Sequence, residues 1–279
     1  MTEVTHDSIR GERESMAKVI ERARDLEAYN TEVARRHARA ISRDSDLARD
    51  DALAPGMRPS DVALESIKIA VEAAGVWSRS VLVSGPTPHA DYSLLRAMME
   101  SLATAVWILG PEDSRQRVTR IFRLAALESK EFDQYVKRVD RMSDGMHPEH
   151  RAGLRHTHQS EDTRLRSLAI AAGLDTKFIF ARETITRTAI LEQAAEYIPQ
   201  LHPVDAWGLW SLCSGLAHGQ RMYATGLSNR SEVAFFDETV ETTLSASGSV
   251  LIRFVDAVWW MLESAVELYN IRASAADQA

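Results

Sequence analysis

The residues best suited to chemistry lie within one short stretch in the C-terminal third of the chain. Ser214, His218, Gln220 and Arg221 all fall between positions 214 and 221. Ser214 and His218 are four positions apart, so they share one face if the stretch is helical. A histidine can give or take a proton near neutral pH, and an arginine binds phosphate or carboxylate through several donors. The stretch therefore predicts an acid–base or anion-binding site centred on His218.

Two neighbouring residues indicate where this site lies. Gly219 directly follows His218, and glycine is the commonest residue just past the end of a helix, so the helix is predicted to end there. The imidazole would then lie at the mouth of a helical bundle. Tyr223 and Arg221 follow within one turn and are expected, with Ser214, to add binding contacts. The alternative is a structural histidine that caps a helix end by bonding backbone carbonyls.

Two nucleophilic mechanisms are disfavoured by the surrounding sequence. Ser214 with His218 would suit a serine hydrolase, but no strand–turn–helix pattern surrounds the serine. Cys213 is the only cysteine, which excludes an intramolecular disulfide. Its neighbours are apolar, so its thiol is expected to have a raised pKa and to be unreactive.

A second polar feature interrupts the most apolar segment of the chain. Residues 90–109 are apolar nearly all round, which is typical of a helix at the centre of a bundle. Within them, Arg96 and Glu100 are four apart and share one face. One interpretation is a buried ion pair that fixes helix packing. The other is that the pair faces the same cavity as His218 and Ser214, where it orients the imidazole and binds an anion.

Glycine and proline divide the chain into helical segments, so the sequence predicts an all-α bundle of about seven or eight helices. An N-terminal helical arm is predicted over residues 1–43, a polar, acidic linker over 44–60, and a bundle domain over 61–279. The main helices are expected at about 9–41, 61–83, 90–109, 112–142, 164–172, 186–198, 204–218 and 239–272. Residues 143–159 are predicted to form a loop that could be partly helical. Only 227–237 has some strand character, and it could equally be a long loop.

Three further clusters have ordinary explanations. The predicted loop contains four histidines, His147, His150, His156 and His158. Their spacing matches no metal-ligand pattern and they lack cysteine partners, so no metal ion and no other cofactor is expected.

Three arginines recur every third residue, Arg117, Arg120 and Arg123. They predict a solvated basic ridge that could also steer phosphate-bearing ligands. All six tryptophans fall in predicted helices and are expected in the core.

Composition narrows the class of protein. The 279 residues include 33 basic and 40 acidic side chains, a net charge of −7, which argues against a general nucleic-acid coat protein. No uncharged apolar run reaches the length of a bilayer, and the first residues are too polar for a signal peptide. We therefore expect a cytoplasmic protein with no membrane partner. Its long helices could also support a homodimer or a protein partner.

The sequence Cys-Ser-Gly-Leu-Ala-His-Gly-Gln at a predicted helix end, residues 213–220, resembles the HEPN superfamily of helical proteins. The likeness is to divergent bacterial members found among toxins, abortive-infection systems and phage-defence proteins. The ribonuclease motif of that family is an arginine, a polar residue, a few residues and a histidine, often followed by glycine. Ser214, His218 and Gly219 match this pattern, whereas Cys213 stands at the arginine position. The resemblance implies action on RNA or a nucleotide.

Three functions remain open from the sequence. The first is a divergent HEPN-like protein in which His218 is the acid/base. Arg96 and Arg221 would bind the phosphate, and Ser214 and Glu100 would orient the reacting groups. That Arg96 or Arg221 replaces the missing arginine is an inference outside the family pattern. The second is a non-catalytic helical interaction module. The third is a small-molecule-binding bundle that uses the same polar pocket.

Overall fold

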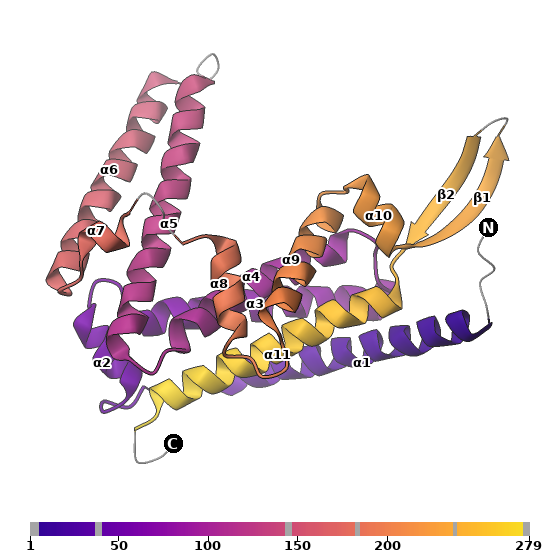
Figure 1. Cartoon of the computed structure of the whole chain (residues 1–279), viewed down its shortest axis with the longest axis horizontal. Helices are drawn as coiled ribbons and strands as arrows, with labels where there is room; N and C mark the ends of the chain where they lie inside the picture. Colours follow the sequence, from indigo (N-terminus) through magenta and orange to yellow (C-terminus); the bar gives the residue numbers. More distant parts are fainter. Residues whose placement is uncertain (1–5, 37–40, 143–146, 182–184, 237–238, 276–279) are drawn as a thin grey trace.

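The chain is almost entirely helical. The computed structural model describes residues 6–36, 41–142, 147–181, 185–236 and 239–275, and within them it has eleven helices and one β-hairpin (Figure 1). The predicted all-α fold is confirmed. The helix count exceeds the predicted seven or eight, because α2, α7 and α10 are too short for a periodic pattern to reveal. The elements are α1 (His6–Arg36), α2 (Asp46–Leu53), α3 (Pro59–Ser84), α4 (Ala90–Leu109), α5 (Ser114–Arg141), α6 (Pro148–Ala171), α7 (Thr176–Ile179), α8 (Arg187–Ala195), α9 (Pro203–Ala217), α10 (Arg221–Leu227), β1 (Asn229–Phe236), β2 (Thr239–Ser245) and α11 (Gly248–Ala273).

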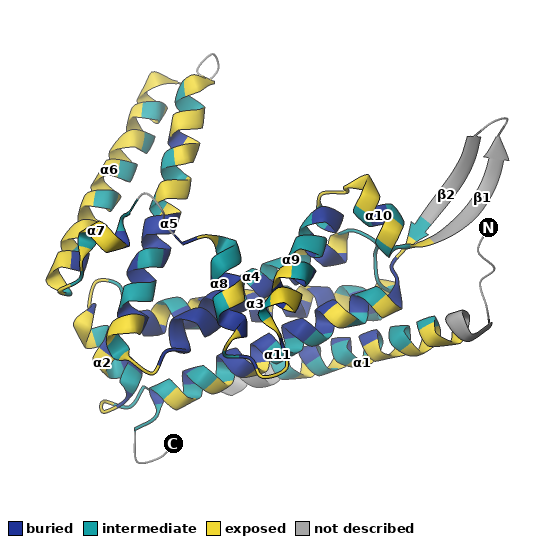
Figure 2. Cartoon of the chain, viewed as in Figure 1, coloured by how far each residue is buried: buried dark blue, intermediate teal, exposed yellow. Residues whose placement is uncertain are grey.

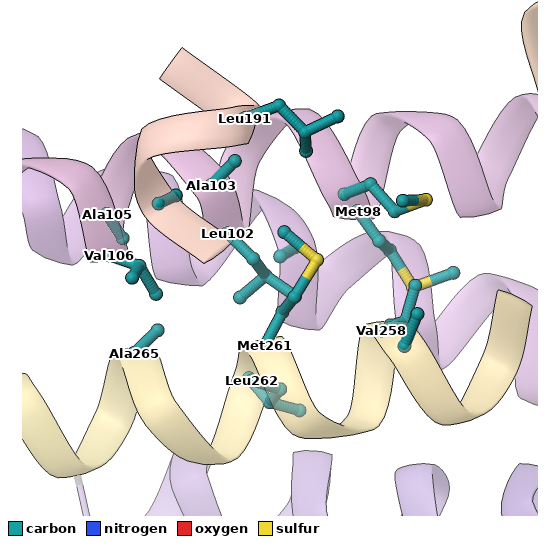
Figure 3. Packing of buried hydrophobic residues seen from close by; sticks show 14 of the residues in the cluster. Met98, Leu102, Ala103, Ala105, Val106, Leu191, Val258, Met261, Leu262 and Ala265 are labelled. Carbon is teal, nitrogen blue, oxygen red and sulfur yellow. The ribbon is translucent and has the colours of Figure 1, made fainter. Parts of the chain in front are cut away.

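Helix α4 lies at the centre of the fold, as its nearly uniform apolar sequence predicts. It packs against α3, α11, α8 and α9, and every residue of its second half from 102 to 109 is buried (Figure 2). Figure 3 shows Met98 and Leu102 of this helix meeting Val258 and Met261 of α11, with Leu191 of α8 on the other side. Apolar burial of this extent is the main source of stability for the bundle. None of the helices in the described ranges is both long and apolar enough to cross a membrane.

The N-terminal segment is part of the folded body. Helix α1 lies along α3 and α11 (Figure 1), and its Val19, Ala23 and Leu26 are fully buried. In the segment predicted as a linker, residues 44–60, the structure has helix α2, whose Leu47 and Asp50 are also fully buried. The polar composition of this segment therefore does not make it a flexible linker, because Asp50 pairs with the buried Arg117 and Asp46 pairs with Arg272.

Helices α5 and α6 form an antiparallel pair whose far end projects from the body (Figure 1). The structure differs here from the predicted loop of 143–159, of which residues 143–146 lie outside the described ranges. Helix α6 begins at Pro148, a favourable residue in a first helical turn, and runs through the rest of the segment. Its His150 and His156 are exposed. No group of three or more metal-binding side chains occurs in the parts of the chain that the structure describes.

The last long helix starts nine residues later than predicted, at Gly248. The residues before it form β2, which pairs antiparallel with β1. The start is fixed by Glu12 of α1, whose carboxylate accepts hydrogen bonds from the backbone N–H groups of Gly248 and Ser249. Burial raises the pKa of Glu12, but these bonds and one from Asn229 outweigh it and leave the pKa below its usual value. A side chain on α1 thus caps α11.

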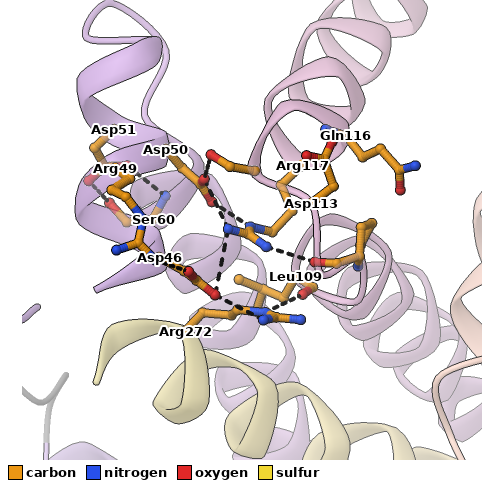
Figure 4. Close-up of polar contacts among 12 residues, drawn as sticks. Asp46, Arg49, Asp50, Asp51, Ser60, Leu109, Asp113, Gln116, Arg117 and Arg272 are labelled. Carbon is orange, nitrogen blue, oxygen red and sulfur yellow. Dashed lines mark hydrogen bonds and ion pairs between the residues drawn. The ribbon is translucent and has the colours of Figure 1, made fainter. Parts of the chain in front are cut away.

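A buried polar network joins α2, α5 and α11 (Figure 4). Arg117 is fully buried, and its Nε and Nη2 atoms donate to the two carboxylate oxygens of Asp50, at 2.5 and 3.0 Å. Nη1 of the same arginine donates to the carbonyls of Pro111 and Glu112 at 2.7 Å. Arg272 of α11 donates to Asp46 at 2.9 Å and completes the network.

The predicted basic ridge is therefore wrong for Arg117, which faces the interior of the protein. The two other arginines are partly covered by aromatic rings. The guanidinium of Arg120 lies 5.1 Å from the ring centroid of Trp107, and that of Arg123 lies 5.3 Å from the centroid of Phe178. Arginines of this kind pack through their planar faces, so a three-residue repeat did not mark a solvated surface.

Candidate functional site

Helix α9 ends where the sequence predicts. Gly219 has a φ of +63°, the left-handed conformation that glycine adopts without strain. The N–H of Gly219 donates to the carbonyl of Leu216, and the N–H of Gln220 donates to that of Gly215. These two bonds form a Schellman motif, which satisfies the last carbonyls of the helix and leaves His218 exposed at its end.

Helix α4 brings Arg96 to this helix end. Its Nη1 atom donates to Ser214 Oγ at 3.0 Å and lies 3.3 Å from His218 Nε2. A guanidinium has only donors, so Nε2 is the acceptor of this contact. The predicted meeting of Arg96 with His218 is thus found in the structure.

Glu100 and Trp210 hold the guanidinium in place. Glu100 Oε1 accepts one hydrogen bond from Arg96 Nε and one from Trp210 Nε1, both at 2.8 Å. The guanidinium carbon of Arg96 lies 5.2 Å from the ring centroid of Trp210, a cation–π contact. Arg96 is therefore fixed on three sides. We refer to Arg96, Glu100, Trp210, Ser214 and His218 as the Arg96–His218 cluster.

Trp210 was not among the predicted site residues. It lies four positions before Ser214 and eight before His218, so all three share one face of α9. That spacing was a usable signal, together with the need of an indole N–H for an acceptor. It was masked because tryptophan in an apolar helix is expected to be core.

The ion pair between Arg96 and Glu100 is more exposed to solvent than its position in an apolar helix suggests. The side chains of Arg96 and Glu100 are 28% and 36% exposed, so the interpretation as a buried ion pair is wrong. Solvent reaches the pair, and removing one partner does not leave a fully buried charge. The same opening lets a ligand reach the guanidinium. Glu100 also lines a cavity of about 700 Å³ with the carboxylates of Asp61, Glu65 and Glu128. These four acidic groups outnumber the single cation of the lining, Arg187, and make the cavity unsuited to an anion.

The two residues expected on the far side of Gly219 differ in their surroundings. Arg221 is the first residue of α10 and is exposed. The ring of Tyr223 instead packs on Gly215, where an added Cβ atom would lie 2.5 Å from the ring. Tyr223 therefore holds α10 against α9, and Arg221 is the residue of the two that a ligand can reach.

This packing predicts opposite effects for the same substitution at two positions of α9. Gly215→Ala places a methyl group on the Tyr223 ring and is expected to destabilise the protein by about 1–3 kcal/mol. Gly208→Ala places one in open space and is expected to stabilise it by about 0.5–1 kcal/mol, since alanine favours helix. Denaturant unfolding measures both. Equal changes of the same sign would show that Tyr223 does not pack on Gly215.

Two other residues, His89 and Cys213, lie near the end of α9 and contribute to structure. His89, in the turn before α4, bonds the carbonyl of Leu216 through Nδ1 at 3.2 Å and ties that turn to the end of α9. Cys213 is fully buried, and burial raises the pKa of its thiol far above the usual range, only partly offset by Arg96. The prediction of a raised pKa at Cys213 is confirmed, and its thiol is not a candidate nucleophile.

The cluster combines an exposed imidazole with a guanidinium held beside it. Such a pair can bind a phosphate and move a proton at one of its oxygens. No family model matches the chain, and no curated protein or solved structure is significantly similar to it.

Proposed function

We propose that the protein is a divergent HEPN-like ribonuclease that cleaves RNA without a metal ion at the Arg96–His218 cluster. The observation that supports this most strongly is the position of Arg96. The HEPN motif has an arginine where this chain has Cys213, and Arg96 of α4 supplies a guanidinium within 3.3 Å of His218 from a different helix. In the proposed enzyme, Arg96 therefore takes the part of the motif arginine.

The proposed reaction uses the 2′-hydroxyl of RNA as the nucleophile. His218 Nε2 takes the proton of the 2′-hydroxyl, and the 2′-oxygen forms a bond to phosphorus. The bond from phosphorus to the 5′-oxygen breaks, and the imidazolium returns its proton to that oxygen. The products are a 2′,3′-cyclic phosphate and a 5′-hydroxyl, so every proton is accounted for by one histidine.

Arginine contributes by stabilising the charge that builds up on the phosphate. As a phosphate enters, its oxygens would take over the hydrogen bond that Arg96 Nη1 makes to His218, which frees Nε2 to act as the base. Glu100 and Trp210 keep the guanidinium aimed at the helix end. Arg221, exposed beyond Gly219, would act as a second cation for the phosphate. A ribonuclease of this kind would suit a toxin or a phage-defence component.

The test compares RNA and DNA strands of the same sequence, incubated with the purified protein in the presence of EDTA. Cleavage of RNA but not DNA is expected, and a single 2′-deoxy substitution at the cleaved linkage should stop cleavage there. The 5′ fragment should end in a cyclic phosphate, which mass spectrometry detects. Equal cleavage of DNA, or no cleavage of RNA with or without magnesium, would contradict the proposal.

A further inference from the structure

The outer face of α9 extends from the Arg96–His218 cluster to a half-exposed tryptophan. Val204 and Trp207 are 64% and 45% exposed, whereas Trp77 and Trp107 are fully buried. The expectation that every tryptophan belongs to the core is therefore wrong for Trp207. The outer face continues through Ser211 to Ser214 and His218, with spacings that alternate between three and four residues, so all these side chains share one side of the helix.

The side chains of α9 between Trp207 and the cluster leave room and carry no charge. Gly208, the residue after Trp207, has open space where a Cβ atom would lie, since no other atom comes within 4 Å of that position. Ser211 is the only side chain on the outer face between Trp207 and Ser214, and it carries no charge. A ligand on this surface therefore meets an indole at one end and a guanidinium at the other.

The length of this surface limits what can occupy it. A helix rises 1.5 Å per residue, so Trp207 lies about 10 Å from Ser214 and about 17 Å from His218 along the axis. Stacked nucleotides are spaced about 3.4 Å apart in each strand, so this span corresponds to no more than about five nucleotides. A base can stack on a protein side chain only when it is not already stacked in a duplex.

We infer that Trp207 is a stacking residue for one base of a single RNA strand whose phosphate is bound by the Arg96–His218 cluster. This inference rests on the proposed function and adds the form of the substrate. Phosphate matches the charge of Arg96, and a base presents the planar face that a half-exposed indole binds. Trp207 touches no reacting atom, so it sets affinity and the position of cleavage.

The test measures binding without chemistry. A fluorescently labelled 2′-O-methyl hexanucleotide has no free 2′-hydroxyl and is not cleaved, so anisotropy reports its Kd. Trp207→Ala is expected to raise this Kd about 5- to 100-fold, the usual loss for one stacked base, and Trp207→Phe about 3-fold or less. A matched dinucleotide is too short to reach from the cluster to Trp207. Its affinity should therefore be the same for wild type and Trp207→Ala.

Tyr135→Ala is the control, because Tyr135 is an aromatic residue of similar exposure, 49%, on α5. It should leave both affinities unchanged. An unchanged hexanucleotide Kd in Trp207→Ala overturns the inference, as does an equal loss with the dinucleotide or no binding by wild type. A wild-type dimer that Trp207→Ala converts to monomers would instead make this face a protein interface. The RNA cleavage assay decides the proposed function independently of all these results.

Discussion

Arg117→Met is expected to lower the free energy of unfolding by about 3–5 kcal/mol. Arg117 and Asp50 are both fully buried, and the guanidinium provides two of the hydrogen bonds that the carboxylate receives. Methionine fills a similar volume but donates nothing, so Asp50 would keep only Ser114 as a hydrogen-bond partner in the network. The carbonyls of Pro111 and Glu112 would also lose their donor. Chemical denaturation of the purified variant measures the change.

The control is Arg138→Met, the same substitution in the exposed last turn of the same helix. It should change stability by about 0.5 kcal/mol or less. Combining Arg117→Met with Asp50→Leu removes both buried charges and is expected to recover most of the loss, because an apolar pair of similar volume needs no partner. A loss below about 1 kcal/mol in Arg117→Met alone would show that water replaces the guanidinium.

The parts of the site that the sequence predicts are those in which one polar group interrupts an apolar helix. Arg96 and Glu100 are the only charges in the middle of α4, and α9 between Asp205 and Ser214 has Ser211 as its one hydroxyl and no charge. A polar group on a central helix of a bundle needs a polar partner. When α4 and α9 pack side by side, the polar groups of each helix become the partners of the other. Gly219 was predictable for a local reason, since its conformation depends on neighbouring residues alone.

Arg117 could not be predicted because its partner lies far away in the sequence. Asp50 is 67 positions earlier, in a segment whose acidic, proline-bearing composition is typical of a linker. Composition reports how polar a segment is, but it does not report whether its charges are paired. The same limit hid the first part of helix α6, whose polar residues favour helix as readily as they favour loop.

Trp207 was misassigned for a different reason. A tryptophan is counted as apolar, but each one also has an N–H group and a flat ring that can lie at a surface. Trp210 uses its N–H to hold Glu100, and Trp207 leaves nearly half of its surface exposed. Which face of α9 is covered depends on where α4 and α8 pack, and that is set by contacts between helices. The pattern within α9 alone carries no such information.

His218→Ala is expected to reduce RNA cleavage by about 100-fold or more while the protein stays folded. The loss follows because the proposed reaction has a single group that takes and returns the proton, and general acid–base catalysis contributes about 10² to 10⁴ in rate. The fold should persist because His218 is exposed and the helix end is held by Gly219 and backbone bonds. Initial rates on one RNA strand measure the activity, and a thermal melt measures the fold. His156→Ala, an exposed histidine on α6, is the control and should keep full activity.

Arg96→Met tests the second half of the same site, and its expected loss is also about 100-fold or more, the usual effect of removing a donor that stabilises charge in the transition state. Arg96→Lys separates charge from geometry. A lysine keeps the charge but has its donors on one nitrogen, without the planar spread with which the guanidinium reaches Glu100, Ser214 and a phosphate. An activity between those of wild type and Arg96→Met is therefore expected. If Arg96→Met cleaves RNA at the wild-type rate while His218→Ala does not, the guanidinium that replaces the motif arginine has to come from elsewhere. Arg221→Met then becomes the decisive variant, because Arg221 is the exposed arginine that follows His218 on the far side of Gly219.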